Sequence, residues 1–212
     1  MTQPLLSILI PTVVGREGQL GQLLNCLEQQ YGPLDIKSDL KKNEFGYSGV
    51  KYDLEDVEVI IVKDSKENTI GAKREFMYSI ANGTHSVMVD DDDELAPNAI
   101  KLILEAIKSN PEVDVISFEE FVSIDGKEYK SNHSLEYADW EGDGNSLFPD
   151  GFHFHRTPFF KSVIKTEIAK SVPIPHIRFG EDHQWAQALK PHIKSEIHIP
   201  EQIYRYIHIS SD

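Results

Sequence analysis

The stretch Ser86-Val87-Met88-Val89-Asp90-Asp91-Asp92-Asp93 places four consecutive aspartates directly after a short apolar run. A buried strand that ends in clustered carboxylates directs several hard oxygen ligands to one point, where like charges repel unless a cation lies between them. The alternative is a solvated acidic turn, in which Glu94 and Pro97 open the next helix and acidic side chains favour its N-terminal dipole. The surrounding sequence favours the cation site.

Apolar runs and helical repeats alternate through the first half of the chain. A short apolar run closed by turn residues predicts a strand, and apolar residues that recur at helical spacing predict a helix. These criteria predict strands at 5–10, 57–62, 87–89 and 113–118, and helices at 16–30, 70–81 and 97–107. The order β-α-β-α-β-α-β predicts an α/β fold with a mostly parallel sheet and helices on both faces.

The polar residues of interest follow three of these predicted strands. Thr12 follows the first strand, Asp64 the second, and the aspartate quartet the third. Because ligands of such sheets bind beyond the carboxyl ends of the strands, the three segments are expected to meet in one crevice.

The remaining segments follow other patterns. Residues 31–56 form a polar insertion without a recognisable motif, which we expect to be a mobile surface excursion. Residues 125–151 are rich in turn residues, and 152–160 alternate aromatic residues with histidines, as a half-exposed strand does. Residues 178–182, Arg-Phe-Gly-Glu-Asp, open a short helix that runs through Leu189. Core packing is expected for Trp185, and Trp140 is left open between sugar stacking and the core.

Composition bounds the class of protein. The chain has 212 residues, of which 40% are hydrophobic, so it can bury a full core and is most simply one domain, 1–212. Its 35 acidic and 21 basic residues give a formal charge of -14, which disfavours broad contact with nucleic-acid phosphates. Cys26 is the only cysteine, which excludes an internal disulfide. The N-terminus lacks a basic leader and no apolar run approaches a membrane span, so a cytoplasmic protein of a bacterium or a virus-infected cell is expected.

Five motifs in order resemble those of family 2 glycosyltransferases with the GT-A fold. They are Ser7-Ile8-Leu9-Ile10-Pro11-Thr12, Val59-Ile60-Ile61-Val62 with Asp64-Ser65, Gly71-Ala72-Lys73-Arg74, Val89-Asp90-Asp91-Asp92-Asp93 and Gly180-Glu181-Asp182. Each motif is weak alone, but their order and their strand and helix contexts make the combination specific. The chain is also similar to the compact glycosyltransferases of bacteriophages and large viruses.

The resemblance implies a division of the chain and a role for each matching residue. Residues 1–118 would bind the nucleotide sugar, and 119–212 would bind the acceptor and hold the catalytic base. Asp182 would be that base. Arg74 would brace the carboxylate of Asp64, which accepts a hydrogen bond from the nucleobase. The donor-binding residues implied are Pro11, Thr12, Asp64, Lys73, Arg74, Asp90 and Asp91.

The resemblance also implies a metal site, for Mn²⁺ or Mg²⁺. Asp92 would bind the ion directly, with Asp90 beside it and His208 as a further ligand near the C-terminus, although four identical residues leave the register open. A bound cation neutralises the leaving nucleoside diphosphate. The alternative for Glu181 and Asp182 is that they only favour the N-terminus of the helix that follows them.

The implied function is a metal-dependent, inverting transfer of a sugar from a nucleotide sugar, expected to be UDP-linked, to a hydroxyl acceptor. The acceptor is expected to be a glycan, and hydroxymethylated bases of viral DNA are an alternative that the charge disfavours. A nucleotidyltransferase on a similar fold would need a glycine-rich phosphate loop after the first strand, where Gly15 is the single glycine. A non-catalytic nucleotide- or metal-binding module would have no use for Asp182.

Overall fold

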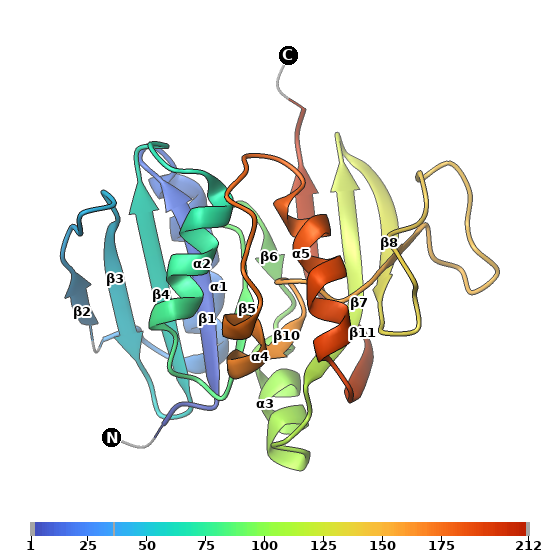
Figure 1. Cartoon of the computed structure of the whole chain (residues 1–212), viewed down its shortest axis with the longest axis horizontal. Helices are drawn as coiled ribbons and strands as arrows, with labels where there is room; N and C mark the ends of the chain where they lie inside the picture. The colour runs from blue at the N-terminus through green and yellow to red at the C-terminus, as the bar shows by residue number, and fades with distance from the viewer. Residues whose placement is uncertain (1–2, 36, 211–212) are drawn as a thin grey trace.

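The computed structural model describes residues 3–35 and 37–210. It confirms the predicted alternation of strands and helices in the first half of the chain, with two unpredicted strands in the insertion (Figure 1). The elements of this half are β1 (Leu6–Val13), α1 (Glu17–Tyr31), β2 (Lys37–Leu40), β3 (Ser48–Asp53), β4 (Val57–Asp64), α2 (Ile70–Ile80), β5 (His85–Met88), β6 (Glu94–Leu95), α3 (Ala99–Ser109) and β7 (Val115–Ile124).

The described strands form one 11-stranded sheet with the order β2-β3-β4-β1-β5-β10-β7-β11-β6, and β8 and β9 extend it beyond β7. Strands β4, β1 and β5 are parallel, and their register sets Val13 opposite Asp64 and Leu9 opposite Met88. The carboxyl ends of the parallel strands β1, β4 and β5 lie on the same side of the sheet. Thr12, Asp64 and the aspartate quartet therefore lie near one another there, as predicted. The α/β class is therefore confirmed.

The second half of the chain adds antiparallel strands to this parallel centre. Strand β10 lies between β5 and β7 and is antiparallel to both, whereas β11 is parallel to β7. The elements of this half are β8 (Lys127–His133), β9 (Phe154–Arg156), β10 (Val163–Lys165), α4 (Thr166–Ser171), α5 (Glu181–Leu189), a 3₁₀ turn (Lys190–His192) and β11 (Glu196–His208).

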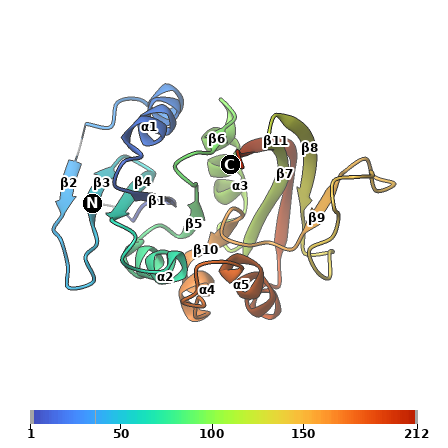
Figure 2. The ribbon, with the colours of Figure 1, turned by 90° about the horizontal axis from the view of Figure 1, so that it is seen from above.

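Helices cover both faces of the sheet, as Figure 2 shows from above. Helices α1 and α3 lie on one face, where Leu23 and Ile107 belong to one apolar cluster. Helices α2, α4 and α5 lie on the other face, where Met77 and Trp185 belong to a second cluster. Trp185 is fully buried and stacks on Tyr78, which confirms its predicted place in the core. No helix in the described ranges is both long and apolar enough to cross a membrane.

The expectation of a mobile surface excursion at residues 31–56 is wrong for most of the segment. Strand β3 pairs antiparallel with β4, and β2 pairs with β3 at the edge of the sheet. Tyr47 is only 3% exposed and stacks on Phe76, with ring centroids 5.0 Å apart. A Cβ atom on Gly49 would lie 1.9 Å from the carbonyl oxygen of Ile61, so this close pairing needs a glycine. The polar exposed side chains of an edge strand explain why the segment resembled a loop.

The segment 125–151, predicted as turns, contains β8. Asp125 and Gly126 have φ angles of 51° and 78° and join β7 to β8 as a two-residue hairpin. An Asp-Gly pair favours this turn because both residues tolerate positive φ. The alternating segment 152–160 forms a strand only at Phe154–Arg156.

Candidate active site

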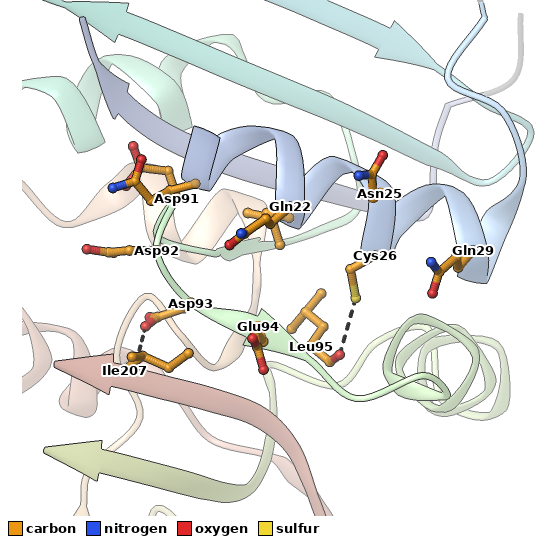
Figure 3. A pocket seen from close by; sticks show the side chains of 12 residues that line it. Gln22, Asn25, Cys26, Gln29, Asp91, Asp92, Asp93, Glu94, Leu95 and Ile207 are labelled. Carbon is orange, nitrogen blue, oxygen red and sulfur yellow. Dashed lines mark hydrogen bonds between the residues drawn. The ribbon is translucent and has the colours of Figure 1, made fainter. Parts of the chain in front are cut away.

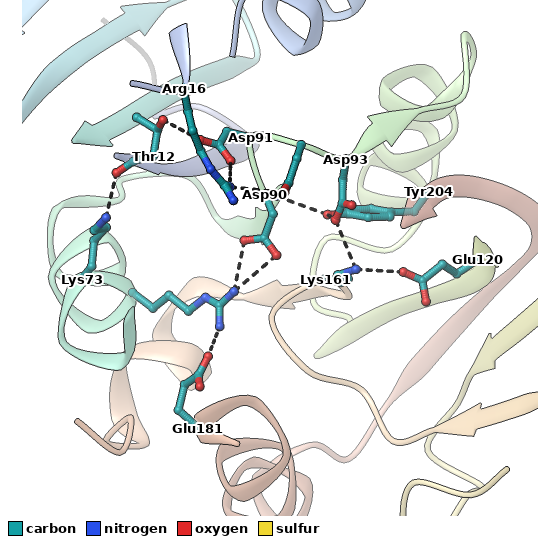
Figure 4. A network of polar contacts seen from close by, with 12 residues as sticks. Thr12, Arg16, Lys73, Asp90, Asp91, Asp93, Glu120, Lys161, Glu181 and Tyr204 are labelled. Atoms are coloured by element: carbon teal, nitrogen blue, oxygen red, sulfur yellow. Dashed lines mark hydrogen bonds and ion pairs between the residues drawn. The ribbon is translucent and has the colours of Figure 1, made fainter. Parts of the chain in front are cut away.

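The four aspartates form a turn between β5 and β6, and alternate side chains lie in different surroundings (Figure 4). Asp91 and Asp93 are 2% and 3% exposed. The side chains of Asp90 and Asp92 are 26% and 40% exposed. The turn therefore presents two open carboxylates and holds two closed ones.

Asp91 joins the turn to the end of β1. Its carboxylate accepts a 2.6 Å hydrogen bond from Thr12 Oγ1 and another of 2.6 Å from Arg16 Nη1. Arg16 also lies 3.1 Å from a carboxylate oxygen of Asp92. Burial, followed by the nearby charges of Asp90 and Asp91, raises the pKa of Asp92 despite the opposing effect of Arg16. One guanidinium thus only partly offsets the negative charge of the turn.

Asp93 joins the turn to β11 and to a buried lysine. It accepts hydrogen bonds from Tyr204 Oη at 2.7 Å and from the main-chain nitrogen of Ile207 at 2.9 Å, and Lys161 Nζ lies at 3.2 Å. Burial raises the pKa of Asp93 to about 7, and the neighbouring Asp90 contributes to the increase.

Lys161 is shared with Glu120, whose carboxylate lies 3.1 Å from Nζ. Burial alone would raise the pKa of Glu120, but Lys161 and a hydrogen bond with His133 outweigh it and lower the pKa to about 2. The Glu120–Lys161 pair is therefore ionised and almost fully buried.

Arg74 of α2 links the aspartate turn to α5. Its Nη2 donates to Asp90 at 3.1 Å, its Nη1 pairs with Glu181, and its guanidinium lies 3.6 Å from the ring centroid of Phe160. The expectation that Arg74 braces Asp64 is wrong. Lys73 occupies that role: its Nζ lies 2.5 Å from Asp64 Oδ1.

The Asp64–Lys73 pair lies at the ends of β1 and β4. Lys73 Nζ also donates to the main-chain oxygen of Thr12 at 2.7 Å. Asp64 is 3% exposed, and its Oδ2 has no hydrogen-bond partner among the described residues. Asp64 and Lys73 line a cavity of about 130 Å³ together with Val13 and Arg178. Pro11, by contrast, is buried within β1, opposite Val62.

Asp182 is the second residue of α5. The helix begins directly after Gly180, which adopts a φ of 78°. The Oδ1 of Asp182 accepts a hydrogen bond from the main-chain nitrogen of His183 at 2.8 Å. Asp182 lines a cavity of about 330 Å³ together with Arg74 and Asp90. Residues from three distant parts of the sequence therefore border one space.

A second cavity of about 410 Å³ lies on the other side of the aspartate turn. Figure 3 shows Gln22, Asn25 and Gln29 along α1, with Glu94 of β6 nearby. Cys26 Sγ donates to the main-chain oxygen of Leu95 at 3.3 Å, which ties α1 to β6. The wall of this cavity is formed mainly by carboxamides and the carboxylates of the turn.

A divalent cation fits the charge of this site. The network contains seven carboxyl groups and four basic side chains, so acid is in surplus; the carboxyl groups belong to Asp64, Asp90, Asp91, Asp92, Asp93, Glu120 and Glu181, and the basic groups to Arg16, Lys73, Arg74 and Lys161. Asp90 and Asp92 have the more exposed carboxylates of the turn, each in contact with one arginine, and hard carboxylate oxygens suit Mg²⁺ and Mn²⁺.

The structure does not bring His208, the third expected metal ligand, together with Asp90 and Asp92. His208 is exposed at the end of β11 and stacks on Tyr206, with ring centroids 6.3 Å apart. Within residues 3–35 and 37–210, no three side chains of His, Cys, Asp or Glu are arranged to hold a metal ion.

Several residues of the site carried no sequence signal that we recognised. Lys161, Glu120 and Arg16 belong to no motif, although a lysine directly after Phe159-Phe160 is a cation in an apolar run and thus a sign of a buried pair. Arg156 likewise follows an alternating aromatic segment, and its guanidinium lies 5.1 Å from the ring of Trp140.

Comparisons with known proteins match this chain by sequence and by fold. A sequence model described as "Glycosyl transferase family 2" matches residues 7–176. No curated protein matches the sequence.

Solved glycosyltransferases share the fold at low sequence identity. TarS of S. aureus is 15% identical with a TM-score of 0.56, over 95% of this chain and 36% of that chain. A TarS structure of residues 1–349 with UDP-GlcNAc is 13% identical with a TM-score of 0.57, over 98% and 59%. The mannosyltransferase PcManGT of Pyrobaculum calidifontis, solved with GDP-Man and Mn²⁺, is 11% identical with a TM-score of 0.55, over 97% and 57%. The chain thus spans between about a third and three fifths of the length of these solved chains.

Proposed function

The chain belongs to glycosyl transferase family 2, and from that premise we propose that it transfers a sugar from a nucleotide sugar to a hydroxyl acceptor, with inversion and with a divalent cation. One observation carries the proposal: Asp182, Asp90 and Arg74 border the same cavity of about 330 Å³. A base and a carboxylate turn that face one space can act on the two sides of a single anomeric carbon.

The donor nucleobase would bind at Asp64. Its buried Oδ2 has no partner, and a buried acceptor without a hydrogen bond is costly unless a ligand supplies the donor. The imide N–H of a uracil is such a donor, whereas adenine has no imide N–H and offers only its exocyclic amine. Lys73 would hold the carboxylate in place through its 2.5 Å contact with Oδ1.

The diphosphate would lie beside the open carboxylates of the turn. Asp90 and Asp92 would hold a divalent cation, which supplies charge neutralisation for the leaving nucleoside diphosphate. Asp91 and Asp93, which are closed by Thr12 and Tyr204, would fix the turn so that these two carboxylates point outward.

Asp182 would take the proton from the acceptor hydroxyl. That oxygen forms a bond to the anomeric carbon while the bond from this carbon to the phosphate oxygen breaks, and the configuration at the carbon inverts. Asp182 forms no ion pair among the described residues, so its second oxygen is free for the acceptor. One base and no covalent intermediate are sufficient.

A panel of nucleotide sugars tests this proposal. Thermal shift reports binding, and release of nucleoside diphosphate in the absence of acceptor reports slow donor hydrolysis, each with and without Mn²⁺. We expect one class of uridine-linked donor to stabilise the protein and to be hydrolysed only with the metal. A protein that neither binds nor hydrolyses any nucleotide sugar would contradict the proposal.

A further inference from the structure

The cavity beside Asp182 has walls made by the second half of the chain. Its volume is about 330 Å³, and it is lined by aromatic rings from several elements: Trp140, Phe154, Phe159 and Tyr206. Small-molecule sites are commonly apolar clefts with a few placed polar groups. The polar groups of this cavity therefore indicate which ligand it takes.

Most of the charged groups that line this cavity neutralise one another. Arg74 pairs with Asp90 and Glu181, and Lys161 pairs with Glu120. Asp182 and Arg156 also line the cavity, and neither forms an ion pair with any described residue. The cavity thus contains one carboxylate and one guanidinium whose charges are not matched by a direct partner.

Arg156 is held in a fixed orientation. Its Nη1 donates to the main-chain oxygens of Glu141 at 2.7 Å and His155 at 2.8 Å. The guanidinium lies 4.8 Å from the ring centroid of Phe154 and 5.1 Å from that of Trp140. Its Nε and Nη2 make no hydrogen bond to the described residues, which leaves donors for a ligand.

Two further polar atoms of the cavity walls have no partner. Ser131 is 1% exposed, and its Oγ is buried without a hydrogen bond in the described part of the chain. Trp140 Nε1, which can only donate, is likewise buried without a hydrogen-bond partner among the described residues. Together with Arg156, these groups form a set of donors that a ligand rich in acceptor oxygens would satisfy.

We propose that the acceptor carries a carboxylate or phosphate group beside its reactive hydroxyl, and that Arg156 binds this anionic group while Asp182 takes the hydroxyl proton. The inference rests on the proposed function and names the class of its acceptor. The hydroxyl loses its proton to Asp182 and gains the bond to the anomeric carbon, and the anionic group is unchanged. Trp140, Phe154 and Tyr206 would contact the apolar face of the acceptor.

The surroundings of Arg156 support an anionic partner. Burial lowers the pKa of Arg156, and the charges of Glu120 and Asp182 only partly offset this effect. A bidentate carboxylate or phosphate is the partner that a half-buried, planar guanidinium fits best.

The test uses acceptor probes that share one ring: glucose, glucuronate and glucose 6-phosphate. Glucuronate and glucose 6-phosphate separate a carboxylate from a phosphate source. Binding by titration calorimetry and transfer from the donor are measured for the parent, for Arg156→Gln and for Arg156→Lys. Lys127→Gln is the matched control, because Lys127 also lies over an aromatic ring of this region, that of Tyr129, but outside the cavity.

We expect at least one anionic probe to bind the parent more tightly than glucose, and Arg156→Gln to remove this preference with a loss of roughly ten- to hundredfold. Arg156→Lys should restore part of it, and Lys127→Gln should leave it unchanged. Equal binding of charged and neutral probes by the parent would overturn the inference, as would an equal loss for both probes in Arg156→Gln.

Donor hydrolysis without acceptor separates this inference from the proposed function. Hydrolysis of a nucleotide sugar by the parent together with no preference for an anionic probe would contradict the acceptor class alone. Absence of both donor binding and hydrolysis would contradict the proposed function itself. Circular dichroism and thermal melts show whether Arg156→Gln keeps the fold, and Ser131→Ala, a smaller change in the same wall, should weaken the anionic probe by a lesser factor.

Discussion

The two sides of the site differ in how their charges are matched. Around the aspartate turn and the end of β4, each basic side chain of the network contacts at least one carboxylate, as Lys73 does with Asp64 and Arg74 with Asp90. The cavity formed with the second half of the chain is lined by four members of this network and also by Arg156 and Asp182, which have no such partner among the described residues. We call the region around the turn and the end of β4 the paired side, and Arg156 and Asp182 the unpaired side. The ion pairs of the paired side hold the side chains of the site in place, whereas the unpaired side has charged groups available for reactants.

The difference follows from the cost of burying charge. A buried ion pair stabilises little in net terms, but removal of one member leaves an uncompensated charge and is strongly destabilising. A charge that stays unpaired beside a cavity is instead a candidate for binding or catalysis. The paired and unpaired groups should therefore respond differently to substitution, which the following predictions test.

The largest effect is expected on the unpaired side, at Asp182. A base used only when the hydroxyl attacks stabilises the transition state and contributes little to donor binding. Asp182→Asn should therefore reduce transfer by about a hundred- to ten-thousandfold with near-normal donor affinity. Steady-state rates and calorimetry with the donor measure the two quantities.

Asp139→Asn is the control for this change. Asp139 contacts His183, the neighbour of Asp182 on α5, at 2.6 Å, but does not line the cavity. It should retain transfer within a small factor of the parent. Undiminished transfer by Asp182→Asn would show that the base is another residue. It would also contradict the view that the unpaired charged groups act on the reactants.

On the paired side, the largest effect is expected on stability, at Lys161. Lys161→Met would leave Glu120 and Asp93 buried without their cation, so the free energy of unfolding should fall by about 3–5 kcal/mol. Urea denaturation measures this quantity.

Lys165→Met, four positions further along at the end of β10, is the matched control. Lys165 pairs at 2.7 Å with Glu112, whose side chain is 85% exposed, so the loss should be about 0–1 kcal/mol. Similar losses for both variants would show that the Glu120–Lys161–Asp93 group is not a closed network.

A smaller effect is expected at the open carboxylates of the turn. Removal of one carboxylate from a hard-cation site should weaken metal-dependent binding by roughly tenfold or more. Asp92→Asn should therefore lose the Mn²⁺-dependent part of uridine diphosphate binding in calorimetry, and Glu94→Gln, one position beyond the quartet, should keep it. Equal, metal-enhanced binding by parent and Asp92→Asn would remove Asp92 from the metal site.

The smallest effect is expected at the nucleobase. Uridine diphosphate should raise the melting temperature more than adenosine diphosphate at equal concentration, since the shift follows mass action and Asp64 offers an acceptor to an imide. Asp64→Asn should reduce the difference. Equal shifts for both nucleotides in the parent would remove Asp64 from this role.

Local pattern predicted the first half of the fold well. The strands around Ile60 and Val87 are buried on both faces and read as apolar runs, and the parallel order then places Thr12, Asp64 and the quartet at one edge. Strand β3 lacks this signal because its mostly polar side chains are only half-buried, and the edge strand β2 beyond it is polar and largely exposed, so the insertion has no apolar run that predicts a strand.

The missing parts of the site come from contacts between distant residues. Lys161 meets Asp93 across 68 positions of sequence, and Arg156 reaches the cavity from a three-residue strand that pairs with β8 and bridges to Glu141. No local pattern encodes such pairings. The sequence also did not show that Lys73, and not Arg74, contacts Asp64. These adjacent residues of α2 point in different directions, and only the packed structure shows which of them reaches Asp64.

The anomeric configuration of the product tests the central claim most directly. With an active donor from the nucleotide-sugar panel and an acceptor that the parent uses, proton NMR of the first-formed product reports the configuration at the transferred carbon. A single displacement with Asp182 as the only base predicts the configuration opposite to that of the donor. Retention of the donor's configuration would contradict the account.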